Sequence, residues 1–400
     1  MSFLGGMFGS PRNRFGKKVL EQVLGYEAVE TAHFDTEAFE IGYRLKNGYV
    51  AKMNLGTLYR RFDGKITAGL FQAVDNLILP PEAPQGWKQA APRLRPVLRR
   101  AGYGSGAIRV GELEGRDLVL SRPALPFLTE MVVIDLPSTV QFVTKQELSS
   151  WGVDAEQVYA VAHANLTELA MNTLEALEPP QGMRVMDFVD DDGESYVGSL
   201  PLVAGWLEGV RARTDTRPLL FLPGHLGMLV VLGATPTALP QLLALAAERL
   251  EGALRPLSAV PYTVDDNGDV VPFEVDADHP AHGLIRRAHA QLAVGAYHAQ
   301  TERLRAEAER EGAIMELLHV RAPDGSEYTM TSWTDGVTNL LPAADFICFV
   351  TGDGDVFRVA WEDVSGLVTL ELAAEYDPPR YRVHDHPPAE IMTRLRALAS

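Results

Sequence analysis

Residues 137–177 have the sequence PSTVQFVTKQELSSWGVDAEQVYAVAHANLTELAMNTLEAL and carry the strongest structural signal in the chain. They predict a strand, a turn at Trp151-Gly152 and one long amphipathic helix over 154–177, capped by Asp154 or by the preceding turn. Apolar side chains recur at helical spacing and form the predicted core stripe: Val158, Val161, Ala162, Leu169, Leu174 and Leu177. This order of elements predicts an α/β domain around the segment.

Two hairpins can be placed in register from their alternating apolar residues. In the first, a three-residue loop at 46–48 pairs Tyr43 with Ala51 and Ile41 with Met53, which makes one face of the ribbon apolar. A two-residue loop would mix the faces, and we therefore predict the longer loop.

The second of these hairpins turns at 267–268. Here a two-residue loop pairs Val264 with Val271 and Tyr262 with Phe273 on one apolar face. Each strand contains a proline, which lacks a backbone donor, so we expect this ribbon at the edge of a sheet.

The rest of the chain predicts a mixed α/β and α+β protein with several hairpins. Helices are expected over 66–79, 200–212, 239–254 and 282–311. Strands are expected over 183–189, 195–198, 219–222 and 228–232, and a further hairpin over 108–121. A mostly antiparallel C-terminal sheet is expected from 314–320, 328–333, 346–350, 356–361 and 368–372.

Composition along the chain predicts several domains. Residues 1–16 are rich in Gly, Ser, Pro and Arg, which is typical of a mobile arm. The prolines at 123 and 126 favour a boundary after a basic α+β region. The expected parts are 1–16, 17–125, an α/β domain at 126–276, and a long helix with an antiparallel sheet at 277–400.

The composition also indicates a cytoplasmic protein. No apolar run approaches the roughly 18 residues of a membrane span, and the N-terminal residues do not resemble a secretory signal. Cys348 is the single cysteine, so no disulfide can form within the chain. We expect no membrane span.

Charge is distributed unevenly. Residues 1–100 contain 15 Lys and Arg against 9 Asp and Glu, whereas residues 101–400 contain 21 against 44. Because the chain as a whole carries a net charge of −17, it repels polyanions at long range, which makes nucleic acid an unlikely partner. The opposite charges of the two regions favour a protein partner or a homo-oligomer.

Motifs for metals, cofactors and nucleophiles are not found in the sequence. His282, His289 and His298 are seven and nine residues apart, whereas two ligands on one helix face lie three or four apart. The acidic runs at 190–194 and 265–269 are typical of turns. We therefore expect no metal and no cofactor, and the catalytic residues, if there are any, stay unknown.

Six residues remain as candidates for a binding site: His225, Asn165, Arg93, Arg95, Arg99 and Arg100. A structural hydrogen bond is the main alternative for Asn165. For the arginines at 93–100, two interpretations stay open. They neutralise the chain's own acidic parts or a second subunit, or they form an external face for an anionic partner.

Several quoted segments together resemble a known family. The segment 137–177 is followed by DDDG at 190–193, LLFLPGHLGMLVVLG at 219–233 and RPLSAVPYTVDDNGDVVPF at 255–273. Over residues 130–275 this order resembles the YtpQ-like family of bacterial proteins, a domain of unknown function. The family often has a partly charged tripeptide after the proline of the apolar strand. Here that place is occupied by Gly224-His225-Leu226, so the resemblance implies no charged site.

The leading functional hypothesis is a non-catalytic protein-interaction or scaffold protein. It follows from the missing catalytic motifs, the expected edge strands and the opposite charges of the two regions. A hydrolase or transferase with a dispersed active site is the alternative. Nucleic-acid contact through the basic N-terminal region is a third possibility.

Overall fold

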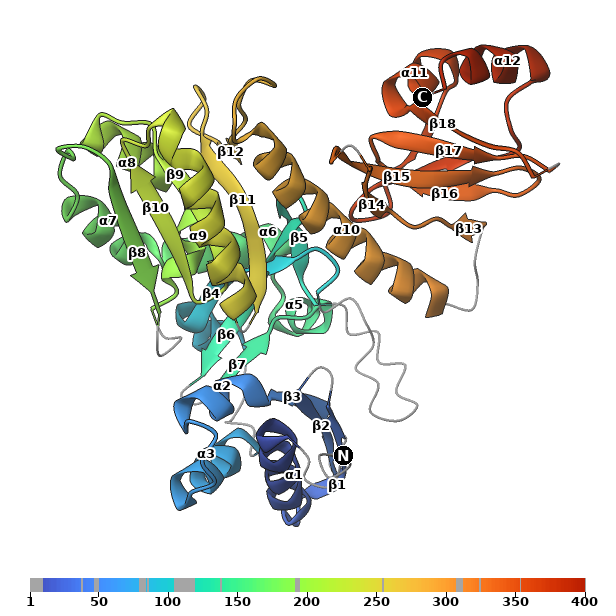
Figure 1. Cartoon of the computed structure of the whole chain (residues 1–400). Helices are drawn as coiled ribbons and strands as arrows, with labels where there is room; N and C mark the ends of the chain where they lie inside the picture. The colour runs from blue at the N-terminus through green and yellow to red at the C-terminus, as the bar shows by residue number, and fades with distance from the viewer. Residues whose placement is uncertain are drawn as a thin grey trace, which may run out of the picture. The chain divides into compact units, whose positions relative to one another are not determined.

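The computed structural model shows a protein of mixed α/β architecture, which confirms the predicted fold class (Figure 1). The described residues are 10–36, 39–46, 50–78, 84, 86–103, 119–136, 139–190, 195–253, 255–306, 312–323, 325–352 and 354–399. They form five sheets in which most neighbouring strands are antiparallel.

The chain divides into two compact units. Unit 1 comprises Met1–Arg95, Gly106–Leu120 and Val132–Asn165. Unit 2 comprises Pro96–Ser105, Ser121–Met131 and Leu166–Ser400. The finer division into four parts stays a prediction.

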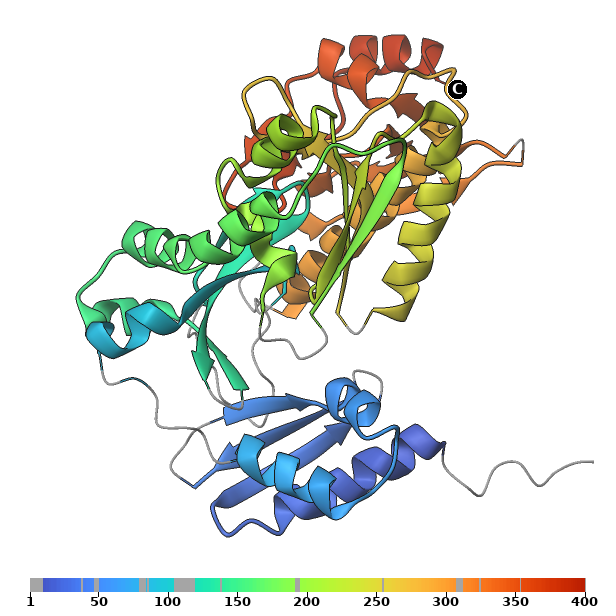
Figure 2. The same ribbon diagram turned by 90° about the vertical axis from the view of Figure 1, so that its left-hand side faces the viewer.

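The N-terminal part of unit 1 is a three-stranded sheet covered by helices. Its elements are α1 (Pro11–Leu24), β1 (Val29–Asp35), β2 (Glu40–Leu45), β3 (Val50–Asn54), α2 (Leu55–Arg61) and α3 (Ala68–Ile78). Figure 2 shows α1 and α3 beside each other on this sheet. Ser10 caps α1 by accepting a hydrogen bond from the Asn13 N–H at 3.2 Å. The arm predicted over 1–16 is therefore too long, because α1 begins at Pro11 and Phe15 is fully buried.

The first hairpin has the predicted register. Tyr43 pairs with Ala51 and Ile41 pairs with Met53 between β2 and β3. The sheet buries the side chains of Ile41, Tyr43 and Met53 on one face, and this one-sided burial makes the alternation informative. The loop itself, at 47–49, lies outside the described residues.

A second sheet has the order β4-β6-β5, and β7 also pairs with β6. Its strands are β4 (Leu94–Arg100), β5 (Ser121–Leu125), β6 (Leu128–Leu136) and β7 (Thr139–Phe142). The next helix, α5 (Lys145–Trp151), begins with a capping box between Thr144 and Glu147. It ends at Gly152, whose φ of +68° fits the predicted turn. The hairpin expected over 108–121 lies mostly outside the described residues.

The single helix predicted over 154–177 is wrong. The chain forms α6 (Ala155–Ala164) and α7 (Thr167–Glu175). Between them, the Asn165 side-chain amide donates to the carbonyl oxygens of Ala91 at 2.8 Å and Leu94 at 3.0 Å. These long-range hydrogen bonds hold Asn165 at the end of α6, although the apolar spacing continues past it.

The centre of unit 2 is a five-stranded antiparallel sheet of order β12-β11-β9-β10-β8. The strands are β8 (Arg184–Val189), β9 (Leu219–Gly224), β10 (Gly227–Leu232), β11 (Pro256–Val264) and β12 (Val270–Pro272). Two helices, α8 (Trp206–Thr214) and α9 (Leu239–Gly252), pack against it, and Figure 1 shows α9 crossing its face. β9 and β10 are buried on both faces, as their unbroken apolar sequences predict.

The strand predicted at 195–198 is wrong. Val197–Leu202 instead forms a 3₁₀ helix, and β8 pairs with β10. A Cβ atom at Gly198 would lie only 2.8 Å from the carbonyl oxygen of His225. The segment thus packs tightly on the β9–β10 turn. The following helix begins at Trp206, later than the predicted residue 200.

The register predicted for the second hairpin is wrong by one residue. Val264 pairs with Val270, and the Asp265 N–H donates to the Asp269 carbonyl at 3.0 Å, which leaves a three-residue loop. The Asp265 carboxylate accepts a hydrogen bond from the Asp269 N–H at 2.9 Å, and Gly268 has a φ of +86°. This loop chemistry outweighs the apolar pattern. As expected from its proline, β12 lies at the edge of the sheet.

The C-terminal part of unit 2 begins with the long helix α10 (His282–Ala306). One sheet is ordered β13 (Ala313–Ile314), β16 (Asn339–Pro342), β20 (Arg380–Val383) and β19 (Glu371–Ala373). The other is ordered β14 (Leu318–Arg321), β15 (Glu327–Thr334), β17 (Phe346–Val350) and β18 (Val356–Ala360). α11 (Trp361–Leu367) and α12 (Ala389–Ala397) complete this part.

The C-terminal strands are mostly antiparallel, as predicted, but they form two sheets. Only the β13–β16 and β15–β17 pairs are parallel among the described strand pairs of these two sheets. The short strands β16 and β20 were not predicted, because prolines and turn residues flank them. In the described ranges, no helix combines the length and apolar character needed to span a membrane.

Candidate anion-binding site

The structure distributes the six predicted site residues between the two units. Unit 1 contains Asn165, Arg93 and Arg95. Unit 2 contains His225, Arg99 and Arg100. The residues of each unit are therefore described by themselves.

In unit 1, the contacts of Asn165 and Arg95 are structural, and Arg93 is exposed. Asn165 bonds the backbone at Ala91 and Leu94, as described above, which agrees with the structural interpretation of this residue. The Arg95 guanidinium donates to the carbonyl oxygens of Leu94 at 2.9 Å and Pro92 at 3.0 Å. These bonds stabilise the start of β4, and we assign no ligand to Asn165, Arg93 or Arg95.

In unit 2, β4 ends with two arginines, of which Arg99 is buried and Arg100 is half-buried. Arg99 is only 3% exposed; its Nη1 donates to the Leu98 carbonyl at 2.7 Å, and its guanidinium lies 5.4 Å from the centre of the Tyr103 ring. The Nε of Arg100 donates to the Leu257 carbonyl on β11 at 2.7 Å. Neither arginine therefore belongs to an exposed basic face, in contrast to one of the interpretations left open from the sequence.

The charge of a further arginine acts on Arg99. Burial and then the nearby positive charge of Arg255 lower the pKa of Arg99 to about 10, while the phenols of Tyr103 and Tyr196 act in the opposite direction. Arg99 therefore stays charged at neutral pH. Arg255 is half-buried just before β11, and its carbonyl accepts a hydrogen bond from the His225 N–H at 3.3 Å. The backbone of His225 is therefore hydrogen-bonded to the backbone of Arg255.

The backbone around these arginines is held firmly. The buried Asp190 carboxylate accepts hydrogen bonds from the N–H groups of Ser195 at 3.1 Å and Tyr196 at 2.9 Å. Tyr196 has a φ of +59°, which is uncommon for a residue other than glycine and recurs at functional sites. Together with the close approach of Gly198 to His225, these bonds hold the backbone of Tyr196, whose phenol acts electrostatically on Arg99.

The side chains brought together here suit binding better than catalysis. Guanidinium groups donate to oxyanions in a forked geometry, and phenol hydroxyls can add single hydrogen bonds. No general base or nucleophile is needed for such binding. We refer to Arg99, Arg255, Tyr103 and Tyr196 as the arginine site.

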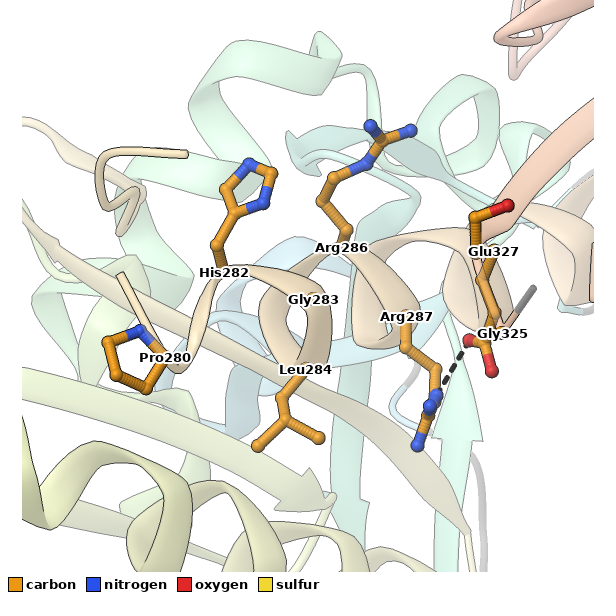
Figure 3. Close-up of a pocket in the computed structure, with 9 residues that line it drawn as sticks. Pro280, His282, Gly283, Leu284, Arg286, Arg287, Gly325 and Glu327 are labelled. Carbon is orange, nitrogen blue, oxygen red and sulfur yellow. Dashed lines mark hydrogen bonds and ion pairs between the residues drawn. The ribbon is translucent and has the colours of Figure 1, made fainter. Parts of the chain in front are cut away.

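A pocket of about 380 Å³ lies between the start of α10 and the turn that precedes β15 (Figure 3). Figure 3 shows Arg286 and Arg287 pointing in different directions from α10. Arg287 donates to Glu327 at 2.7 Å, and Arg286 pairs with Asp345 at 2.8 Å. The bonds from Arg287 and then Arg321 lower the pKa of Glu327 to about 2. Because carboxylates of the chain pair with both Arg286 and Arg287, we interpret this pocket as part of the packing contact between α10 and the C-terminal sheet and not as a ligand site.

The arginine site includes residues that the sequence did not single out. Arg255 directly precedes a strand without charged residues, and this lone charge at a strand start is the one signal that points to it. Tyr103 lies in a glycine-rich loop, and Tyr196 lies in the mispredicted strand. Among the described residues, no three His, Cys, Asp or Glu side chains gather closely enough to hold a metal ion. Comparison of the chain with protein-family models, curated proteins and solved structures finds no match.

Proposed function

We propose that this chain is a non-catalytic interaction protein that binds an anionic group of its partner at the arginine site. The observation that supports this proposal is the approach of two like charges, Arg99 and Arg255, of which Arg99 is 3% exposed. Like charges in a buried setting repel one another, and an anion between them would turn this repulsion into attraction.

The residue types favour recognition over the hydrolase or transferase alternative. An enzyme of those classes needs a nucleophile or general base held near the reacting atom. The arginine site offers hydrogen-bond donors, and the contact that ties His225 to it uses the backbone. A donor set of this kind supplies affinity and orientation for an oxyanion.

The remaining expectations from the sequence stay proposals. We propose a cytoplasmic location, a protein partner or a second copy of the chain, and membership of the YtpQ-like family over residues 130–275. That segment includes Arg255 but not Arg99, so the resemblance to the family does not extend to the whole arginine site. Nucleic acid remains disfavoured, because of the net charge of −17 and the burial of Arg99.

Anion binding can be tested by calorimetric titration with acetate and inorganic phosphate, which represent the carboxylate and phosphorylated side chains of a partner. We expect saturable binding of at least one anion and its loss in Arg255→Gln. Arg249→Gln is the matched control, because Arg249 is half exposed in the same unit and pairs with Asp187 at 2.8 Å. Equal binding by the wild type and Arg255→Gln would contradict the proposal.

A further inference from the structure

We infer that two copies of this chain pair through β8, antiparallel and edge to edge, so that the five-stranded sheet of one copy continues into the other. β8 is the outermost strand of that sheet, and β10 is its only strand partner among the described residues (Figure 1). This edge does not include the arginine site, so pairing through β8 and anion binding can be tested separately.

The backbone of β8 presents hydrogen-bonding groups to its outer edge. The Asp190 N–H donates to the Leu226 carbonyl at 2.7 Å, and β8 pairs with β10 over its whole length without a register shift. Because backbone groups alternate sides along a strand, those of Val185, Asp187 and Val189 point away from β10. No backbone group of the described residues pairs with them. An edge of this kind is a template for a further strand.

The side chains at this edge are apolar and exposed. Met183 is 48% exposed, Val185 is 40% exposed and Val189 is 52% exposed. They lie on the face that α9 crosses, because Asp187 on the same face pairs with Arg249 of α9. The opposite edge strand, β12, has three residues and contains a proline, whereas β8 has six residues and neither proline nor lysine. Short length, proline and lysine keep edges from pairing, so β8 lacks the protection that β12 has.

The order of side chains in β8 favours a second copy of the chain as the partner. In an antiparallel pair centred on Asp187, two-fold symmetry places Val185 opposite Val189 of the second copy, and Met186 opposite Phe188 of the second copy. Apolar side chains then meet apolar side chains on both faces of the joined sheet. The outward backbone groups of the two strands form about six hydrogen bonds in this register.

The charge at the centre of the pair is offset within each copy. Two Asp187 side chains lie opposite one another there, and like charges in this position oppose pairing. Arg249 donates to the Asp187 carboxylate at 2.8 Å, and its own side chain stays half exposed beside the edge. Each copy therefore contributes one guanidinium with its carboxylate, and the centre carries no net charge.

Sedimentation velocity of the full chain measures this pairing. We expect a reversible dimer with a dissociation constant between about 1 and 100 µM, because one pair of short strands covers less area than a standard interface. Val189→Lys should weaken the dimer by at least about tenfold, because the substitution acts at two places related by symmetry. Val356→Lys is the matched control. Val356 is 56% exposed on β18, an edge strand of another sheet, so its substitution should change the dissociation constant by less than about twofold.

The central charges provide a second test that does not depend on disrupting the strand. Arg249→Gln should weaken the dimer by at least about tenfold, because two carboxylates then face each other without a cation. Adding Asp187→Asn to this variant should restore the affinity to within about threefold of the wild type. Hydrogen exchange gives a third readout. The amides of Val185, Asp187 and Val189 should exchange at least about tenfold faster in the dilute monomer than in the dimer.

Three results would overturn the inference. The first is a wild type that stays monomeric up to about 100 µM. The second is a dimer that Val189→Lys and Val356→Lys affect equally, since another surface then joins the copies. The third is slow exchange of the three outward amides in the dilute monomer, since the chain itself then covers this edge. A dimer lost in Arg249→Gln and regained with Asp187→Asn would support pairing centred on Asp187.

Discussion

Arg380 provides the sharpest test of how the C-terminal part of unit 2 is held together. It is fully buried on β20, and its nearest cation–π contact is the Tyr297 ring at 5.3 Å. Its five N–H groups make hydrogen bonds of 2.5 to 3.5 Å to the side-chain oxygens of Gln300 and Thr301 and the carbonyl oxygens of Tyr297, Met315 and Leu340. These acceptors link α10, β16 and the segment after β13 to one guanidinium, without a carboxylate among them.

Two large effects oppose each other at this residue. Hydrogen bonds from a charged donor contribute about 1.5 kcal/mol each at the lower end of their range, or about 7 kcal/mol in total for Arg380. Burial is the largest cause that lowers its pKa from 12.5 to about 10, and this net shift corresponds to a penalty of about 3 kcal/mol on the charged side chain. The hydrogen bonds therefore outweigh desolvation by about 4 kcal/mol. We expect Arg380→Met to lower the local free energy of unfolding by about this amount, because the acceptors stay behind unpaired.

Native-state hydrogen exchange of the amides in β16 and β20 measures this local free energy directly. Arg382→Met is the matched control on the same strand. Arg382 pairs with Glu371 at 3.0 Å and Glu375 at 2.8 Å, both more than half exposed, so its loss should cost less than about 1 kcal/mol. If Arg380→Met is neutral or stabilising while the protein keeps its fold, desolvation outweighs the five hydrogen bonds and this reasoning is refuted.

Three further changes have defined outcomes. Asn165→Ala should lower the free energy of unfolding by about 2 kcal/mol in urea titrations, because two backbone carbonyl groups lose their donor, whereas Asn172→Ala at an exposed position should cost less than about 0.5 kcal/mol. Gly198→Ala should lower the melting temperature in calorimetry and weaken anion binding, because its Cβ would meet the His225 carbonyl at 2.8 Å; unchanged melting would contradict the close packing. Glu327→Gln tests the folded-state pKa of about 2, which lies below the ordinary 4.5. The carboxylate should therefore stabilise the protein above about pH 4.5 and lose this contribution as the pH falls toward 2, so that wild type and variant converge in acid-range urea titrations.

The two hairpins explain when register can be predicted from sequence. In β2, the buried residues Ile41 and Tyr43 alternate with partly exposed neighbours, so the apolar pattern selects one pairing. β11 is buried along nearly all its length, so the pattern is equally satisfied by a shift of one residue. The bonds of Asp265 and the left-handed Gly268 then determine the pairing.

The break between α6 and α7 could not be predicted for a different reason. Its cause is a hydrogen bond between Asn165 and backbone more than 70 residues earlier, and no local property of the helix requires it. Asparagine is only mildly unfavourable inside a helix, so propensity does not mark the position either. The β2–β3 hairpin, whose register follows from its local apolar pattern, was therefore predictable. The end of α6, which depends on hydrogen bonds to residues far away in the sequence, was not.

The arginine site extends this argument to function. Arg99 and Arg100 are neighbours in a strand, so their side chains leave β4 in opposite directions and meet different partners. Arg100 binds the Leu257 carbonyl, and Arg255 lies two residues earlier, about 7 Å away along an extended chain. The hydrogen bond from the Arg100 side chain to the Leu257 carbonyl thus ties the end of β4 to the start of β11, and the charge of Arg255 acts on Arg99 although 156 positions separate them in the sequence. Two adjacent arginines at a strand end look like a solvated terminus in the sequence, whereas in the structure Arg99 is buried and Arg100 is half-buried, and this burial of Arg99 is what the proposed anion site rests on.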